Sequence, residues 1–158
     1  MRVIISFFIF IFFFNKLYAS NIKCNFEEVY QDGSVQSGTM LFKEGLMRYQ
    51  YDKYELFTII YNKNYFLIRN NDHKIVNKIK NDELLDKISE ILESYPNIEN
   101  TFEENEYFYL IEKSKKSDFI KRISIKSNKA NLSIYFNDCS FEEIAIKYFQ
   151  PYNFVEIN

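Results

Sequence analysis

One amphipathic helix interrupts a long run of short strand-like segments. Between Asn81 and Tyr95, apolar residues recur at spacings of three and four, with acids and lysines between them, which is the period of a helix with one apolar face. Asn81 or Asp82 can cap the first turn, and Pro96 ends the helix. A helix of about 14 residues is long enough to cover one face of a sheet. The sequence therefore predicts a sheet with a single covering helix over 82–95.

The chain on both sides of this helix is typical of antiparallel strands. Segments rich in aromatic and β-branched residues alternate with short polar turns, which favours a meander of hairpin-connected strands. The expected strands are 23–31, 35–43, 46–52, 55–61, 65–69, 73–79, 98–103, 106–113, 119–126, 131–137 and 141–149.

Two of these segments are apolar on both faces. In 55–61 and in 106–112, both alternating sets of side chains are apolar, whereas 119–126 alternates apolar with polar side chains. A flat single sheet cannot bury both of its faces, so the sheet is expected to curl around a filled interior. Two alternatives stay open: the helix fills the interior completely, or a ligand shares it.

Residues 1–19 have the organisation of a secretory signal peptide. Met1 and Arg2 supply a positive start, Val3–Phe14 is an apolar run interrupted only by Ser6, and Ala19 is a small residue at the expected cleavage point. A spanning helix needs roughly 20 apolar residues, so an uncleaved anchor is the less favoured alternative. The sequence predicts an exported protein with one mature domain, residues 20–158.

Charge and residue content argue against nucleic-acid binding and against an enzyme. Cleavage removes Arg2 and Lys16 and leaves 18 basic and 22 acidic residues, and the basic residues are scattered. The single histidine, His73, has no further His or Cys at ligand spacing, and three isolated glycines cannot build a phosphate loop. No serine can be singled out for a catalytic triad. We therefore expect no catalysis, no metal site and no cofactor.

Adjacent acids and a pair of cysteines complete the candidate features. Glu27-Glu28, Glu103-Glu104 and Glu142-Glu143 should point to opposite faces of a strand, and we expect them to mark solvated faces and strand edges. Cys24 and Cys139 are the only cysteines and can form a disulfide in an oxidising compartment. Two free thiols are the alternative.

The segment Ser37-Gly38-Thr39-Met40-Leu41-Phe42-Lys43-Glu44-Gly45-Leu46-Met47-Arg48-Tyr49-Gln50-Tyr51 carries a family resemblance. It resembles the signature strand pair of the periplasmic carriers of outer-membrane lipoproteins, the LolA-like proteins, which show a glycine, an apolar strand, a basic residue, a turn and a strand rich in arginine and aromatic residues. The pattern continues over 57–68, at Leu84-Leu85 and at Asn137-Asp138. It covers most of the mature chain by pattern rather than by invariant residues.

This resemblance implies both a fold and a function. The implied fold is mainly β, a strongly curved antiparallel sheet forming an unclosed half-barrel, with one amphipathic helix covering the concave face. The implied protein is a monomeric carrier or chaperone in the periplasm that binds the acyl chains of lipoproteins, or other lipid, for transfer towards the outer membrane. Its further partners would be an inner-membrane release complex and an outer-membrane acceptor. The alternative is an envelope sensor or accessory protein that uses the same half-barrel to bind a lipid or protein partner.

The resemblance and the strand alternation together nominate the binding residues. The concave wall would consist of Met40, Phe42, Met47, Tyr49, Tyr51, Phe57, Ile59, Tyr61, Tyr107 and Tyr109. The helix would act as a lid through Leu84, Leu85, Ile88 and Leu92. The chain departs from the family at three places. The proline and Asp-Gly turns that usually flank the next strand are replaced by Asp52-Lys53-Tyr54 and Asn62-Lys63-Asn64. Ser20–Lys23 leads straight into a strand instead of a helix, and Lys43-Glu44-Gly45 replaces an Arg-Pro turn, which leaves Lys43 as the basic candidate for holding the lid.

Overall fold

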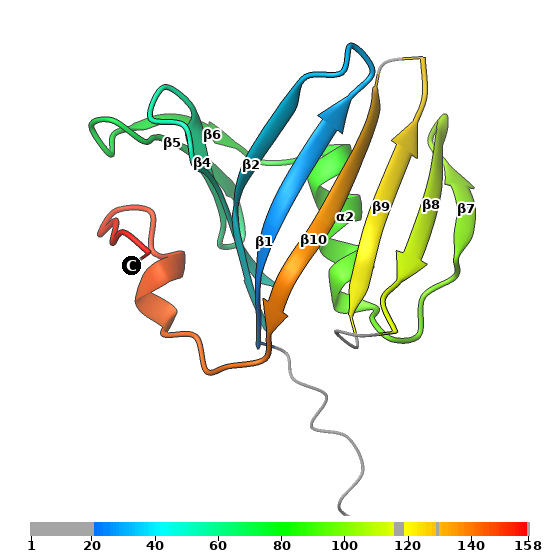
Figure 1. Ribbon diagram of the computed structural model, residues 1–158. Coiled ribbons are helices and arrows are strands. Elements are labelled where there is room, and N and C mark those ends of the chain that lie inside the picture. Colours follow the sequence, from blue (N-terminus) through cyan, green and yellow to red (C-terminus); the bar gives the residue numbers. More distant parts are fainter. Residues whose placement is uncertain (1–20, 116–118, 129, 158) are drawn as a thin grey trace, which may run out of the picture.

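A ten-stranded antiparallel sheet and one α-helix make up most of the computed structural model (Figure 1). The structure describes residues 21–115, 119–128 and 130–157, so the predicted signal peptide lies outside the described residues. The elements are β1 (Asn21–Tyr30), β2 (Val35–Lys43), β3 (Leu46–Tyr51), β4 (Phe57–Tyr61), β5 (Tyr65–Arg69), β6 (Ile75–Ile79), α2 (Glu83–Glu93), β7 (Thr101–Glu104), β8 (Tyr107–Lys113), β9 (Ile120–Lys126), β10 (Asn131–Ser140) and the 3-10 helix η2 (Ile146–Phe149).

The strand order places the first and last strands side by side in the middle of the sheet. The order is β6-β5-β4-β3-β2-β1-β10-β9-β8-β7, so two meanders, β1 to β6 and β7 to β10, meet at the β1–β10 pair. The sheet is strongly curved and is not closed into a barrel, as the unclosed half-barrel prediction requires (Figure 1). Because the chain leaves the sheet at the β6 edge and re-enters it at the β7 edge, α2 must cross one face.

That face is the concave one, and α2 packs its apolar side against it. Asp82 caps the helix, since its Oδ1 accepts a hydrogen bond of 3.0 Å from the Leu85 backbone N–H. Ile88, Ile91 and Leu92 are buried in one cluster with inward-facing residues of both meanders. The predicted helix over 82–95 is therefore correct to within a few residues.

The C-terminal segment covers part of the convex face, where a further strand was expected. The prediction of a strand over 141–149 is wrong: the chain leaves the sheet after Ser140 and forms η2. β10 already pairs with β1 and β9, so it has no free side for another strand. Ile144 and Phe149 instead pack on Leu41 of β2, and Phe154 packs beside Ile60 of β4.

This cover explains the two-sided apolarity of the segment 55–61. Ile60, Phe66 and Ile68 form a buried cluster on the convex side, and Phe154 packs against them. The curl of the sheet accounts for one apolar face, and the C-terminal segment accounts for the other. In β8 the second face is less protected, since Phe108 is 37% exposed.

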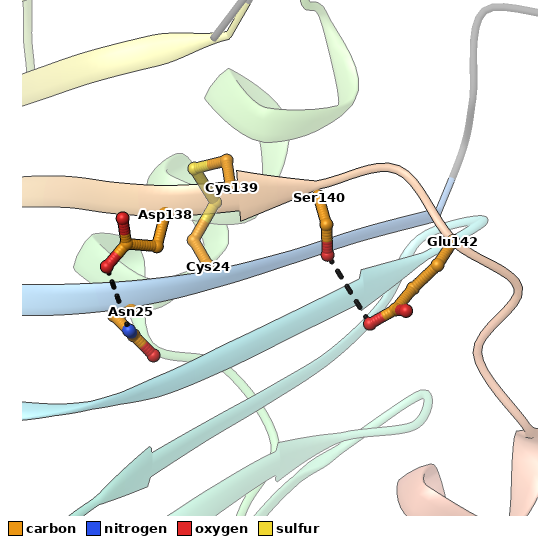
Figure 2. The surroundings of a disulfide bond; sticks show 6 residues. All are labelled: Cys24, Asn25, Asp138, Cys139, Ser140 and Glu142. Atoms are coloured by element: carbon orange, nitrogen blue, oxygen red, sulfur yellow. Dashed lines mark hydrogen bonds between the residues drawn. A yellow bond between two sulfur atoms is a disulfide. The ribbon is translucent and has the colours of Figure 1, made fainter.

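A disulfide links β1 to β10, the two neighbouring strands at which the meanders meet. Cys24 of β1 is bonded to Cys139 of β10 across 115 residues of sequence (Figure 2). Cys24 is fully buried in the main core, and the described residues include no free cysteine. Figure 2 also shows the hydrogen bond from Asn25 to Asp138 beside it. The structure thus contains the pairing that the sequence left open.

Candidate functional site

Strand register brings most of the nominated wall residues onto one surface. Across β2 and β3, Met40 lies opposite Tyr49 and Phe42 lies opposite Met47, and Tyr49 in turn lies opposite Ile59 of β4. Directly opposed residues point to the same face of a sheet. Nine of the ten nominated residues belong to the main core cluster: Met40, Phe42, Met47, Tyr49, Tyr51, Ile59, Tyr61, Tyr107 and Tyr109.

Phe57 is the nominated wall residue outside this cluster. It is half-buried at the start of β4, where its partner across the strand pair is Arg69. The cluster thins towards this corner of the sheet because a charged residue replaces the apolar partners found further along. The structure therefore groups nine nominated residues and separates the tenth.

All four nominated lid residues lie on the side of α2 that meets the wall. Ile88 and Leu92 are 5% and 2% exposed, while Leu84 and Leu85 are half-buried against the same cluster. Ile91, which is not among the four predicted lid residues, is 1% exposed in the same cluster. In this conformation the helix occupies the inner surface of the curved sheet.

Two polar contacts fasten α2 to opposite sides of the half-barrel, and we call them the rim contacts. On the β5 side, the Tyr65 hydroxyl donates a hydrogen bond of 2.8 Å to Asp86 Oδ1. On the β7 side, Lys87 Nζ lies 2.6 Å from Glu104 Oε2 and also pairs with Glu90 of its own helix. Partial burial opposes the charge on Lys87, but the hydrogen bonds to Glu104 and Glu90 prevail and raise its pKa.

The packing of α2 is open along the β7 side. A cleft of about 210 Å³ lies between Ile91 and Glu90 of the helix and Phe102 of β7. A second cleft of about 190 Å³ adjoins Asp86 and Tyr107. Lys87, Glu90 and Glu104 border both clefts, so the β7 rim contact stands between them. On this side, the concave face is therefore not completely sealed by α2.

A buried carboxylate interrupts the apolar wall at β1. Glu28 is 6% exposed and accepts hydrogen bonds from the Tyr30, Tyr49 and Tyr51 hydroxyls, with oxygen separations of 2.5, 2.9 and 3.0 Å respectively. Phe26 stacks on Tyr49, with ring centroids 3.8 Å apart, and meets Tyr51 edge-on. Three donors to one carboxylate satisfy the charge that burial would otherwise penalise.

The same arrangement keeps the three phenols protonated. Burial, followed by the nearby Glu28 carboxylate, raises the pKa of Tyr49 and of Tyr51 well above the ordinary value. Burial and the hydrogen bond to Glu28 raise the pKa of Tyr30 in the same direction. All three hydroxyls therefore remain hydrogen-bond donors throughout the physiological pH range.

The expectation that paired acids are solvated is wrong for Glu28. Glu27 and Glu28 do point to opposite faces, and Glu27 is exposed, but Glu28 points into the concave face. Alternation alone could have shown this, because Phe26 and Tyr30 flank Glu28 at spacings of two on the inward side. Glu103 and Glu104 are exposed as expected.

Arg48 is the second buried charge that sequence reasoning missed. It is fully buried on the convex side, where Nη1 donates to the backbone carbonyls of Tyr148 at 3.2 Å and Val155 at 2.6 Å. Its guanidinium also lies 4.4 Å from the centroid of the Phe154 ring. Burial lowers the pKa of Arg48 to about 10, which leaves it charged at neutral pH. Arg48 fastens the C-terminal segment, roughly 100 residues away in sequence, so no local signal could reveal its role.

The basic residue nominated for holding the lid lies elsewhere. Lys43 Nζ donates to the Ile144 carbonyl at 2.9 Å, so it contacts the C-terminal segment rather than α2. His73 stacks on Phe154, with centroids 4.6 Å apart, and lies 3.3 Å from Glu156. Within the described ranges, no three His, Cys, Asp or Glu residues are grouped so as to hold a metal ion.

In the part of the chain that the structure describes, no helix is long and apolar enough to span a membrane. The chain matches no protein-family model and no curated protein.

Proposed function

We propose that this chain is an exported carrier-like protein that binds the acyl chains of lipoproteins, or of another lipid, against the concave face of its sheet. Helix α2 is the lid. The observation that carries the proposal is the position of α2: a half-exposed helix crosses an apolar concave wall and is held at both sides by polar rim contacts.

The wall suits a flexible apolar ligand. Met40 and Met47 contribute unbranched side chains that can change shape, and Tyr49 and Tyr109 contribute broad aromatic surfaces. A hydrocarbon chain needs apolar contact and no catalytic group, which agrees with the residues that line this face.

The energies of closure and of ligand burial are of similar size. Ile88, Ile91 and Leu92 are almost completely buried, and each contributes about 2 to 3 kcal/mol, so closure gains roughly 6 to 9 kcal/mol. An acyl chain gains about 0.8 kcal/mol for each buried methylene. About 8 to 11 methylene groups would therefore offset the loss of helix packing. A competing lid of this strength permits both binding and release.

Weakening a rim contact provides the decisive test, because a lid that must open binds ligand better when it is held less firmly. The variant Tyr65→Phe removes the hydroxyl bonded to Asp86 and keeps the ring. Loss of one hydrogen bond of about 1 kcal/mol should tighten the binding of a fluorescent fatty acid to the mature protein about fivefold. Tyr152→Phe is the matched control, since Tyr152 is 74% exposed on the other side of the sheet, and should leave the affinity unchanged.

Two results would overturn the proposal. The first is no uptake of the fatty acid by the wild-type protein or by Tyr65→Phe, together with no lipid extracted from protein purified from cells. The second is uptake that is unaffected by Tyr65→Phe, because the ligand would then bind without moving α2. Rescue of a cell depleted of its lipoprotein carrier would separate transport from an accessory role, which predicts binding without rescue.

A further inference from the structure

The two free edges of the open sheet carry opposite charge. Around β6, the segment 73–80 contains three lysines and no acid. Around β7, the segment 99–106 contains four glutamates and no base. Among the described residues, no strand pairs with the outer side of β6 or of β7. Each edge therefore presents unpaired backbone groups beside side chains of a single sign.

Most of these charges face solvent. Lys78 and Lys80 are exposed at the β6 edge, and Glu99 and Glu103 are exposed at the β7 edge. Lys74 lies 3.7 Å from Asp72, and Glu104 pairs with Lys87, so these two charges are partly used within the chain. Lys78 and Lys80 give the β6 edge its positive sign, and Glu99 and Glu103 give the β7 edge its negative sign.

The strand directions allow these edges to meet. Every neighbouring pair in the sheet is antiparallel, so β6 and β7, at the first and tenth positions, run in opposite directions. A second copy that continues the same curved sheet therefore brings its β7 beside β6 as an antiparallel neighbour. The concave faces of the two copies then lie on the same side.

One strand register between β6 of one copy and β7 of the other gives favourable side-chain pairs on both faces of the sheet. Phe102 and Glu104 of β7 are paired with inward-facing tyrosines of β8, whereas Glu103 points to the convex side. On β6, Ile79 lies opposite inward-facing Tyr65, and Lys78 lies opposite Phe66 on the convex side. Placing Lys78 opposite Glu103 also places Ile79 opposite Phe102, so a charge pair forms on one face and an apolar pair on the other.

We propose that β6 of one copy of this protein pairs with β7 of a second copy. Charge disfavours β6 against β6 and β7 against β7, and it favours the mixed pair. A twofold dimer of two half-barrels would use both edges of both copies and leave neither edge open. The proposal goes beyond lipid binding and departs from the expectation of a monomer.

Charge reversal with complementation tests this pairing. Lys78→Glu places a glutamate opposite Glu103, and Glu103→Lys places a lysine opposite Lys78, so the central pair of the contact becomes like-charged and each variant alone should be monomeric where the wild type is dimeric. Each should raise the dimer dissociation constant roughly tenfold or more. A 1:1 mixture should again give a dimer, with one copy of each variant, because the introduced glutamate then faces the introduced lysine at one contact and Lys78 faces Glu103 at the other. Analytical ultracentrifugation of the mature, disulfide-bonded protein at low salt measures all four samples, and added salt should weaken the dimer.

The design separates pairing from misfolding. Lys78 Nζ lies 5.4 Å from the Phe66 ring centroid, so its replacement also loses a contact within the chain. Recovery of the dimer in the mixture excludes misfolding as the cause of dissociation. The control Lys121→Glu alters an exposed lysine on β9 and should leave the dimer intact. A monomeric wild type at high protein concentration, or reversed variants that dimerise alone as the wild type does, would overturn the proposal.

Discussion

Breaking the Cys24–Cys139 bond should cost this protein a large part of its stability. The bond joins the two meanders across 115 residues and so restricts the unfolded chain strongly. A loop of this length corresponds to about 5 kcal/mol of loop-closure entropy at 25 °C. Domains of this size are stable by only about 5 to 15 kcal/mol in total, so the reduced protein should be close to its limit of folding.

Urea unfolding followed by circular dichroism measures this cost. With a urea dependence of about 2 kcal/mol per molar, the midpoint should fall by about 2.5 M on reduction. The comparison needs the oxidised wild type, the reduced wild type and Cys24→Ala/Cys139→Ala, because the double variant also removes buried sulfur. Asn25→Ala is the matched control. It removes only the exposed 3.4 Å hydrogen bond to Asp138 next to the disulfide and should change the midpoint very little (Figure 2).

A midpoint that falls by less than about 0.5 M in the reduced wild type would refute this reasoning. Such a result would mean that the unfolded chain already keeps β1 near β10 without the bond, so that closing the loop costs little entropy. A large loss in the double variant alone would instead assign the effect to packing around Cys24, which is fully buried.

Three further predictions concern single residues. Gly38→Ala should destabilise the fold by about 2 kcal/mol or more in urea unfolding, since an added Cβ would lie 2.0 Å from the Gln50 backbone oxygen; little effect would show that the strands can separate there. Arg48→Met should increase amide exchange over 144–157 about tenfold while the concave core stays protected, and uniform loss of protection would contradict its local role. Because the pKa of Tyr49 is raised in the fold, its contribution is complete below about pH 10 and is lost as pH rises further. Tyr49→Phe should therefore flatten the alkaline fall in the urea midpoint, and an unchanged slope would argue against burial of this phenol.

The sequence predicted helices and strands well wherever the apolar residues of a segment repeat with a single period. Helix α2 and the ten strands of the sheet follow from spacing of apolar residues and from short polar turns. The curled sheet follows from the two-sided apolarity of 55–61. These features depend on neighbours in sequence, which is the information that a periodicity contains.

Features that depend on distant partners were not predictable in this way. The strand prediction over 141–149 failed because alternation cannot reveal that β10 has no free side. In the sequence, Arg48 has the pattern of a solvent-exposed strand residue. Only the fold shows that the C-terminal segment packs over it and accepts its hydrogen bonds. Glu28 is an intermediate case: its inward direction follows from strand alternation, but its satisfaction by three phenols requires β1 and β3 to be aligned across β2.

The topology also limits what α2 can do as a lid. The chain enters the helix from the β6 edge and leaves it towards the β7 edge, so both ends of α2 are tied to opposite sides of the sheet. The convex face of the sheet is not free to take the helix instead, because the C-terminal segment already packs over β2 to β5. In the proposed lid movement, the helix would therefore lift from the wall without leaving the half-barrel. Since the tethers would keep it nearby, its apolar face would compete with a bound acyl chain, and this competition is what would make the ligand releasable rather than permanently held.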